Sequence, residues 1–334
     1  MDITDANVTA ATLTYNRLEL LFENYEAVVR GSVLPTTYVI CDNASDPHTS
    51  DGIFDSLIEL GWEVEGVSSR TIRVGKSVYT AKLTEMICSR YEGCSLQVIN
   101  LPENVGSAGG YAAIFNYVAS TEAEFLWVMD DDGYPASDCL EVMSRHLSEL
   151  PGSYAAVTPL TYCADYRGEI FAPWSGLNAE LVSQKPSGDL ENKLSPFNGS
   201  LYRVDAIREI GAPDPRYYIW GDEDDYRFRV LAKFKTRCVL DAIYFHPRLH
   251  KYEDYMFGKY SLAPPGRIYY SLRNHTFFSL HNGYSTPFIR MFIKQQFVTI
   301  FFRRNYRFRS LCLNFLALYH GAIGDFSNKV DGSK

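Results

Sequence analysis

The first 150 residues alternate between short apolar segments and amphipathic segments, and this alternation constrains the fold more than any other feature of the sequence. Four segments are short and rich in apolar and β-branched residues, as buried strands are. They span residues 8–15, 36–45, 95–104 and 124–132. Three segments with helical spacing lie at 17–31, 109–121 and 137–150. Such alternation predicts an α/β fold whose mostly parallel, Rossmann-like sheet has helices on its faces.

Local signals give some of the boundaries. Gly31 is a candidate C-cap for the first helix, and Ser137 is a candidate N-cap for the third. Residues 62–94 interrupt the alternation and are interpreted as an insertion. Beyond residue 155 the pattern is less regular. There we expect a strand at 155–162, a strand and a helix in 198–211, an acidic turn opening a helix in 217–234, a strand at 237–250 and a helical region at 256–334.

Polar residues stand where the expected strands end. The four clusters are Thr14-Tyr15-Asn16, Asp42-Asn43, Asn104 and Asp130-Asp131-Asp132. Ligands of open α/β sheets bind beyond the carboxyl ends of the strands, and parallel strands bring those ends to one edge. Four clusters that converge on one edge predict a binding site there.

The three adjacent aspartates, Asp130 to Asp132, need a reason, because like charges about 4 Å apart repel by on the order of 1 kcal/mol even in water. Side chains alternate along an extended chain, so Asp130 and Asp132 point the same way and Asp131 points elsewhere. Mg²⁺ and similar cations take one or two carboxylates together with phosphate oxygens. The pattern favours a metal site for a diphosphate over a solvated acidic turn. His246, at the end of a later expected strand, is a candidate third ligand.

Two further segments are candidates for chemistry. Asp222, Glu223, Asp224 and Asp225 open an expected helix, where the helix dipole stabilises anions. A carboxylate there is also a candidate general base for a hydroxyl group. The segment NVGSAGGY, residues 104–111, joins a strand to a helix and lets a ligand approach the backbone closely. It matches neither the dinucleotide-binding fingerprint nor the P-loop.

Composition excludes several classes. A net charge of −8 argues against nucleic-acid binding. Seven dispersed cysteines without a CxxC pair argue against a disulfide framework and a zinc site, and favour a reducing, cytoplasmic setting. The N-terminus lacks the features of a signal peptide, and no apolar stretch reaches the roughly 18 residues of a spanning helix. From Thr286 to Ser310 there are six basic residues and no acidic one.

Together the motifs resemble those of inverting family 2 glycosyltransferases of the GT-A fold, over most of residues 8–250. The resemblance implies a catalytic domain over 1–255, a helical C-terminal region over 256–334, and Mn²⁺ or Mg²⁺ as cofactor. It assigns the metal to Asp130, Asp132 and His246. It assigns the nucleotide-sugar donor to Thr14, Asn16, Arg17, Asp42, Asn104, Gly109, Gly110 and Asp131. Trp220 and Trp174 are candidates for stacking on the acceptor sugar, with a place in the core as the alternative.

One position departs from the family pattern. Counted back from Arg229, the position of the usual aspartate base holds Glu223, and Asp222 is the second candidate. The triple aspartate, Trp220, His246 and the pair Arg273-Asn274 look most like bacterial galactofuranosyltransferases. The resemblance therefore implies transfer from UDP-galactofuranose to a glycan or lipid-linked glycan in cell-surface polysaccharide synthesis. A rhamnosyltransferase that uses dTDP-rhamnose is the alternative donor class.

Other interpretations stay open. A nucleotidyltransferase would need a basic loop near the first strand, where only Arg17 is present. A catalytically silent binding module would keep the fold without the chemistry. The basic, aromatic C-terminal region fits peripheral contact with the anionic inner face of a plasma membrane. The alternatives for it are a subdomain packed on the core and a homo-oligomer contact.

Overall fold

The computed structural model describes residues 7–163, 189–247, 252–255, 258–261, 263–282, 285–303 and 305–330. The chain divides into two compact units, each made of two segments. Unit 1 comprises Met1–Pro215 and Tyr226–Pro247, and unit 2 comprises Arg216–Asp225 and Arg248–Lys334. Helix α7 (Asp222–Lys233) therefore begins in unit 2 and continues in unit 1.

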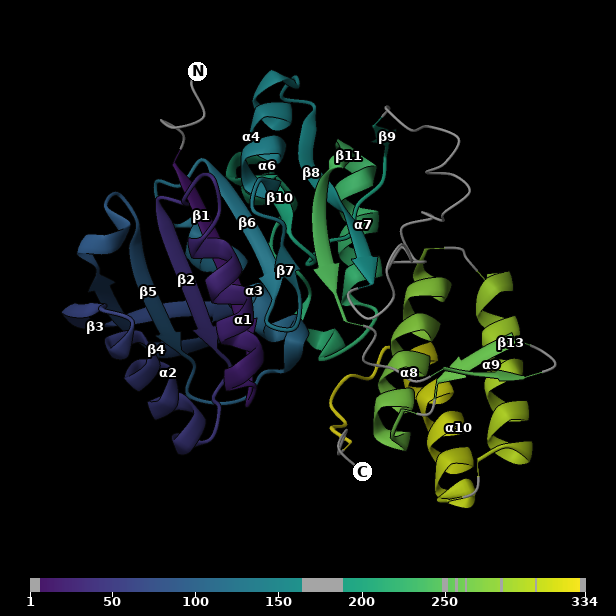
Figure 1. Cartoon of the computed structure of the whole chain (residues 1–334). Helices are drawn as coiled ribbons and strands as arrows, with labels where there is room; N and C mark the ends of the chain where they lie inside the picture. Colours follow the sequence, from purple (N-terminus) through teal and green to yellow (C-terminus); the bar gives the residue numbers. More distant parts are fainter. Residues whose placement is uncertain are drawn as a thin grey trace. The chain divides into compact units, whose positions relative to one another are not determined.

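Unit 1 is built on one large sheet, which has eleven strands within the described residues (Figure 1). Along the path of hydrogen-bonded neighbours the order is β3-β4-β5-β2-β1-β6-β10-β8-β11-β7, and β9 pairs with β11. The strands are β1 (Val8–Thr14), β2 (Thr37–Asp42), β3 (Glu63–Val74), β4 (Ser77–Ile87), β5 (Ser95–Asn100), β6 (Phe125–Asp130), β7 (Tyr134–Pro135), β8 (Tyr154–Cys163), β9 (Leu190–Glu191), β10 (Ser200–Arg203) and β11 (Lys235–His246).

The centre of the sheet is parallel, as the sequence predicts. β5, β2, β1 and β6 pair in parallel, and Figure 1 shows them side by side. The register places Thr14 opposite Asp42 and Leu13 opposite both Cys41 and Asp130. The polar residues that end these strands therefore reach the same edge of the sheet. Antiparallel strands flank this centre, with β4 on β5 and β10 on β6.

Residues 62–94, interpreted as an insertion, form mainly the hairpin of β3 and β4 and a short 3₁₀ turn, Ser89–Tyr91. The hairpin extends the sheet at one edge, and β3 is the outermost strand of that edge. Its side chains are mostly exposed. The regular alternation breaks here because the chain adds two consecutive antiparallel strands, which need no helix between them.

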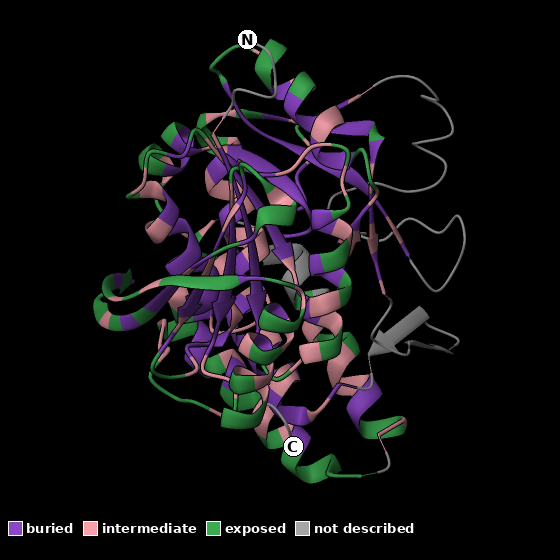
Figure 2. Cartoon of the chain, turned by 60° about the vertical axis from the view of Figure 1, so that its left-hand side comes forward, coloured by how far each residue is buried: buried purple, intermediate pink, exposed green. Residues whose placement is uncertain are grey.

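The helices of unit 1 cover both faces of the sheet, as expected. One buried cluster joins α3 to the sheet, and a second joins α1, α2 and α4 to the opposite face. Figure 2 shows the central strands buried between these layers. The helices are α1 (Leu18–Val29), α2 (Pro47–Glu59), α3 (Gly106–Ala119), α4 (Cys139–Glu149) and α6 (Val204–Ile210).

Two helix boundaries differ from the sequence prediction. The N-cap of α4 is Asp138, not Ser137, whose carbonyl instead accepts a backbone hydrogen bond from Ser32 at 2.7 Å. The C-cap of α1 is Arg30, one residue before Gly31. Helix α2 was not predicted. It has only two buried residues, Ile53 and Leu57, so its apolar periodicity is weak.

Unit 2 contains a hairpin and three longer helices. These are β12 (Tyr252–Tyr255), β13 (Gly258–Ser261), α8 (Pro265–His281), α9 (Ser285–Phe301) and α10 (Arg307–Ile323), with a 3₁₀ turn, Pro215–Tyr217, at its first boundary. Tyr269 and His320 share a buried hydrogen bond of 2.7 Å between α8 and α10. Among the described residues, no helix combines the length and the apolarity needed to cross a membrane.

Candidate active site

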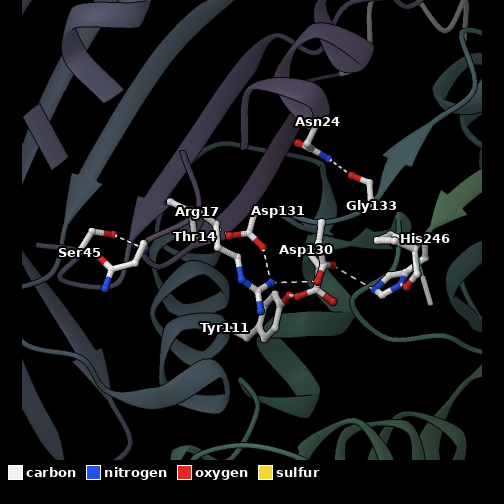
Figure 3. Close-up of polar contacts among 12 residues, drawn as sticks. Thr14, Arg17, Asn24, Ser45, Tyr111, Asp130, Asp131, Gly133 and His246 are labelled. Atoms are coloured by element: carbon white, nitrogen blue, oxygen red, sulfur yellow. Dashed lines mark hydrogen bonds and ion pairs between the residues drawn. The ribbon is translucent and has the colours of Figure 1, made fainter. Parts of the chain in front are cut away.

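The three aspartates lie at the end of β6 and make different contacts (Figure 3). Asp131 accepts a hydrogen bond from the Thr14 hydroxyl at 2.9 Å and one from Arg17 Nη1 at 3.0 Å. The same Arg17 nitrogen lies 2.9 Å from Asp132 Oδ2. Asp131 therefore faces the end of β1, and Arg17 offsets part of the repulsion within the aspartate run.

Asp130, Asp132 and His246 form a separate group. One ligand atom from each lies within 4.8 Å of the others. His246 Nε2 lies 3.1 Å from Asp132 Oδ1, and Figure 3 shows the imidazole beside the carboxylates. The His246 Nδ1–H faces the Pro247 carbonyl at 2.8 Å. A histidine whose Nδ1 donates to a carbonyl presents Nε2 as a ligand, so the group is arranged as a metal site is.

Burial and crowding perturb the titration of the group. Burial, reinforced by the charge of Asp132, raises the pKa of Asp130 to about 7. Burial also raises the pKa of Asp131 to about 6, against the opposing charge of Arg17. Asp132 is buried too, but its hydrogen bond to His246 and the charges of His246 and Arg17 lower its pKa. Burial opposes protonation of His246, while the bond to Asp132 raises the pKa of the imidazole.

Two residues that the sequence did not single out support the aspartates. Tyr111, which follows the paired glycines of residues 104–111, donates its hydroxyl to Asp130 Oδ1. Asn24, fully buried in α1, donates to the Gly133 carbonyl at 2.7 Å. Its Oδ1 accepts from the hydroxyls of Thr12 and Tyr38 at 2.8 and 2.9 Å. The only sequence signal for Asn24 is a polar residue on the apolar face of a helix.

Gly133 ends the aspartate run for a steric reason. A Cβ at this position would lie 2.5 Å from Cε1 of Tyr244, a buried residue of β11. No real Cβ tolerates that approach, so any other residue would displace the ring or the turn. Because Asn24 binds the same residue's carbonyl, the turn after Asp132 is fixed from two sides.

The candidate donor residues at the ends of β1 and β2 form a connected polar network. Asp42 is buried and accepts from Ser45 N at 2.9 Å and from Asn100 Nδ2 at 3.1 Å. Asn16 has a positive φ of 55°. Its backbone N–H donates to Ser45 Oγ at 2.9 Å. These contacts hold the polar ends of two neighbouring strands in one place.

The glycine-containing loop is held by Asn43. Its Oδ1 accepts from Val105 N at 3.0 Å, and its Nδ2 donates to Asn104 Oδ1 at 3.2 Å. Gly109 and Gly110 lie inside α3, where a Cβ would come within 2.7 Å of Val105 and 2.4 Å of Leu13. Close packing is therefore sufficient to require both glycines, and their contact with a donor stays a prediction.

The acidic cluster forms the first turn of α7, within unit 2. Asp222 is buried, with 1% of its surface exposed, and Glu223 is partly buried. Glu223 Oε2 accepts the Gly221 backbone N–H at 3.1 Å. Asp224 lies 3.3 Å from His275 of α8. Burial opposes protonation of His275, and the bond and charge of Asp224 raise its pKa.

Of the two candidate acceptor residues, the structure describes Trp220. Trp220 precedes the acidic cluster, is partly buried and packs against the apolar cluster of α8 and α10. Its backbone has a positive φ of 60°. Trp174 lies outside the described residues.

Known proteins that resemble this chain include a curated galactofuranosyltransferase and two proteins of solved structure. The galactofuranosyltransferase GlfT1 of Mycolicibacterium smegmatis is 30% identical over 251 residues, covering 72% of this chain and 70% of that protein. TarS of S. aureus (residues 1–349), in complex with UDP-GlcNAc, has a TM-score of 0.53 at 14% identity and covers 97% of this chain and 89% of that one. The mannosyltransferase PcManGT from Pyrobaculum calidifontis, with GDP-Man and Mn²⁺, has a TM-score of 0.51 at 13% identity, with coverages of 98% and 90%.

The fold is of the GT-A kind, as the similarity to these two solved structures shows. Residues 75–211 match the family described as glycosyl transferase family 2. The chain belongs to glycosyltransferase family 2, and the predicted family and fold are confirmed. The matched range contains Asp130 to Asp132 and ends before the acidic cluster at Asp222.

Proposed function

We propose that this glycosyltransferase transfers galactofuranose from UDP-galactofuranose, with inversion and with a divalent cation, to a hydroxyl of a glycan or lipid-linked glycan. The convergence of Asp130, Asp132 and His246 at the end of the parallel strands carries the proposal of metal-dependent chemistry. The choice of donor rests on the galactofuranosyltransferase to which 72% of the chain is similar. Such an enzyme would serve the synthesis of bacterial cell-surface polysaccharide.

The residues of the cluster fit a divalent cation. Two carboxylates and one imidazole, with ligand atoms within 4.8 Å of one another, suit Mn²⁺ better than Mg²⁺, which prefers oxygen ligands. A bound cation would neutralise charge on the departing nucleoside diphosphate. It would also stabilise the ionised form of Asp130, whose pKa burial raises to about 7.

The chain's own residues would then divide the work. Asp42 would hold the base or ribose of the nucleotide, and Thr14, Asn16, Arg17 and Asp131 would contact the rest of the donor. Asn104, Gly109 and Gly110 would line the sugar pocket. Glu223 would take the proton of the acceptor hydroxyl as that oxygen attacks the anomeric carbon from the face opposite the leaving group. Attack from that face inverts the anomeric configuration. Asp222 is the alternative base.

Helix α10 carries an exposed apolar face. Four large apolar side chains of this helix are 57–81% exposed: Phe308, Phe315, Tyr319 and Ile323. They recur at intervals of seven and four residues, which places them on one face of the helix. Residues 255–324 contain nine basic residues and no acidic one, in a chain of net charge −8. We infer that this face contacts an anionic membrane surface on the cytoplasmic side, where a lipid-linked acceptor would be presented.

A donor panel tests the proposed activity. The protein would be incubated with Mn²⁺, a short galactofuranosyl-containing acceptor and either UDP-galactofuranose or dTDP-rhamnose, and released nucleotide would be measured. Release of UDP with formation of a longer glycan supports the proposal, and NMR of the new linkage reports inversion. Release of dTDP instead supports the rhamnosyltransferase alternative. Binding of UDP-galactofuranose without transfer to any acceptor supports a catalytically silent nucleotide-sugar-binding module.

A further inference from the structure

The backbone immediately before the acidic cluster is strained. Tyr218 has a φ of 66°, Trp220 of 60° and Gly221 of 92°. Two of these three residues carry a Cβ, and bulky residues rarely adopt positive φ. Such conformations persist only where surrounding contacts hold the backbone in place, and they cluster at functional sites.

Asn274 of α8 lies against the turn and is fully buried. Its Nδ2 lies 2.8 Å from the Tyr217 carbonyl oxygen, 3.0 Å from that of Ile219 and 2.5 Å from that of Trp220. A single amide group therefore contacts three carbonyls of one short turn. A Cβ on Gly221 would lie 3.1 Å from the Asn274 Cβ, so the two backbones also approach closely.

Arg273 fixes the orientation of that amide. Its Nε donates to Asn274 Oδ1 at 2.9 Å, and since a guanidinium only donates, the Asn274 oxygen must face it and the NH₂ must face the turn. Arg273 Nη2 also donates to the carbonyls of Arg216 and Tyr217 at 3.2 and 3.0 Å. The guanidinium is 4.9 Å from the ring centroid of Tyr270 and 4.7 Å from that of Phe326.

The turn connects directly to the acidic cluster. The Gly221 backbone N–H donates to Glu223 Oε2 at 3.1 Å, and the Gly221 carbonyl accepts from Asp225 N at 3.2 Å. A change in the turn would therefore move both the first turn of α7 and the carboxylate of Glu223.

We propose that Asn274, oriented by Arg273, is a positioning residue that holds the 217–221 turn and thereby places the general base at the start of α7. This inference rests on the proposed function for the assignment of the base. The role of Asn274 in fixing the turn rests only on the contacts within unit 2.

Two variants and a matched control test the proposal. Asn274→Ala removes the amide, while Asn274→Asp keeps the volume and the acceptor for Arg273 but has no N–H for the carbonyls. The control is Asn314→Ala in α10, which removes an equally buried amide whose Nδ2 lies 3.3 Å from Gln296 Oε1 and 3.2 Å from Thr299 Oγ1, away from the turn. All three would be assayed with Mn²⁺, UDP-galactofuranose and a galactofuranosyl acceptor, well below their unfolding temperatures.

We expect both Asn274 variants to lower kcat by about 100-fold, since small misplacements of a reacting group have effects of this size. UDP affinity in calorimetry would stay within about twofold of wild type, as expected when a residue acts on the transition state rather than on donor binding. The double variant Asn274→Ala/Glu223→Gln would be no slower than Glu223→Gln alone, because Asn274 acts through Glu223. If Asn274 acted independently of Glu223, the fold-losses in kcat of the two single variants would multiply in the double variant.

Hydrogen exchange supplies a readout that does not depend on activity. Amides of residues 218–222 would exchange at least about tenfold faster in both Asn274 variants and would be unchanged in Asn314→Ala. Unchanged exchange in the Asn274 variants, or a kcat equal to that of Asn314→Ala, would overturn the proposal. Failure of the proposed function would look different: wild-type protein would transfer no sugar, while exchange at the turn would still respond to Asn274.

Discussion

Arg17 Nη1 lies 3.0 Å from Asp131 Oδ1, and the two side chains form an ion pair. The two residues follow different strands, β1 and β6, which pair in parallel. The same nitrogen reaches Asp132 at 2.9 Å, so one guanidinium stabilises two of three adjacent carboxylates. The stability of this edge of the sheet therefore depends on Arg17 whenever no cation is bound.

Replacing Arg17 tests that dependence. Arg17→Met should lower the free energy of unfolding by about 2 kcal/mol, the usual loss for hydrogen bonds to charged groups, because two buried carboxylates lose their donor. Urea unfolding in the presence of EDTA measures it. Adding Asp131→Asn to Arg17→Met should restore part of the loss, and a double variant less stable than Arg17→Met would contradict the assignment.

The metal cluster gives a prediction on binding. Asp132→Ala should abolish Mn²⁺-dependent binding of UDP in calorimetry, because one of two carboxylate ligands is lost. His246→Ala should weaken it at least about tenfold. Asp138→Asn is the matched control, since Asp138 is an exposed acid in the same stretch of chain. Retained Mn²⁺-dependent binding in Asp132→Ala would show that the cation lies elsewhere.

The identity of the base can be decided by two isosteric changes. Glu223→Gln should spare Mn²⁺–UDP binding and reduce kcat by about 10²- to 10⁴-fold, the usual contribution of a general base. Asp222→Asn should have a smaller effect on kcat, since Asp222 is buried and Glu223 is more accessible. The reverse ranking in a single-turnover assay would transfer the role to Asp222.

The pair of His275 and Asp224 predicts a pH dependence of stability. The raised pKa of His275, due to Asp224 and opposed by burial, means that the folded state binds the proton more tightly than the unfolded state. The pair therefore stabilises the folded state fully at pH values below the ordinary histidine pKa of about 6.5. This stabilisation is lost as the pH rises through the higher pKa that His275 has in the folded state. Urea unfolding measures this. The free energy of unfolding of the wild type should exceed that of His275→Gln by a larger margin at pH 6 than at pH 9. An equal difference at both pH values would contradict the pairing.

The apolar face of α10 predicts membrane binding that depends on lipid charge. The protein should sediment with vesicles that contain phosphatidylglycerol and stay in solution with pure phosphatidylcholine, and salt should weaken the binding. Phe308→Ser/Phe315→Ser should reduce sedimentation at least about tenfold, because two exposed aromatic side chains are lost from the contact. If those changes instead dissociate a dimer in analytical ultracentrifugation, the face joins two copies of the chain.

The sequence predicted the sheet centre and the aspartate cluster because both depend on local periodicity. Alternating strands and helices place Thr14, Asp42 and Asp130 at one edge without any knowledge of packing. The division of roles within the aspartate run was predicted from the alternation of side chains along a strand, but β6 ends at Asp130 and residues 131–132 form a turn. Arg17 Nη1 contacts both Asp131 and Asp132, so that division stays a prediction.

What the sequence did not predict depends on contacts between distant residues. Tyr111 and Asn24 become relevant only when α3 and α1 pack beside β6, and neither belongs to a short motif. The packing reason for Gly109 and Gly110 is likewise set by Val105 and Leu13 in three dimensions. The contacts of Arg273 and Asn274 with the 217–221 turn join segments more than fifty residues apart.

That separation has a consequence for how the chain matures during synthesis. Proteins emerge from the ribosome with the N-terminus first, and early segments can fold before later ones exist. A nascent chain that has emerged as far as His246 already contains the aspartates, the histidine and the acidic cluster. Asn274 emerges only afterwards, with α8. Until then the 217–221 turn lacks the contacts that hold its strained backbone, so the base cannot be placed before α8 has emerged.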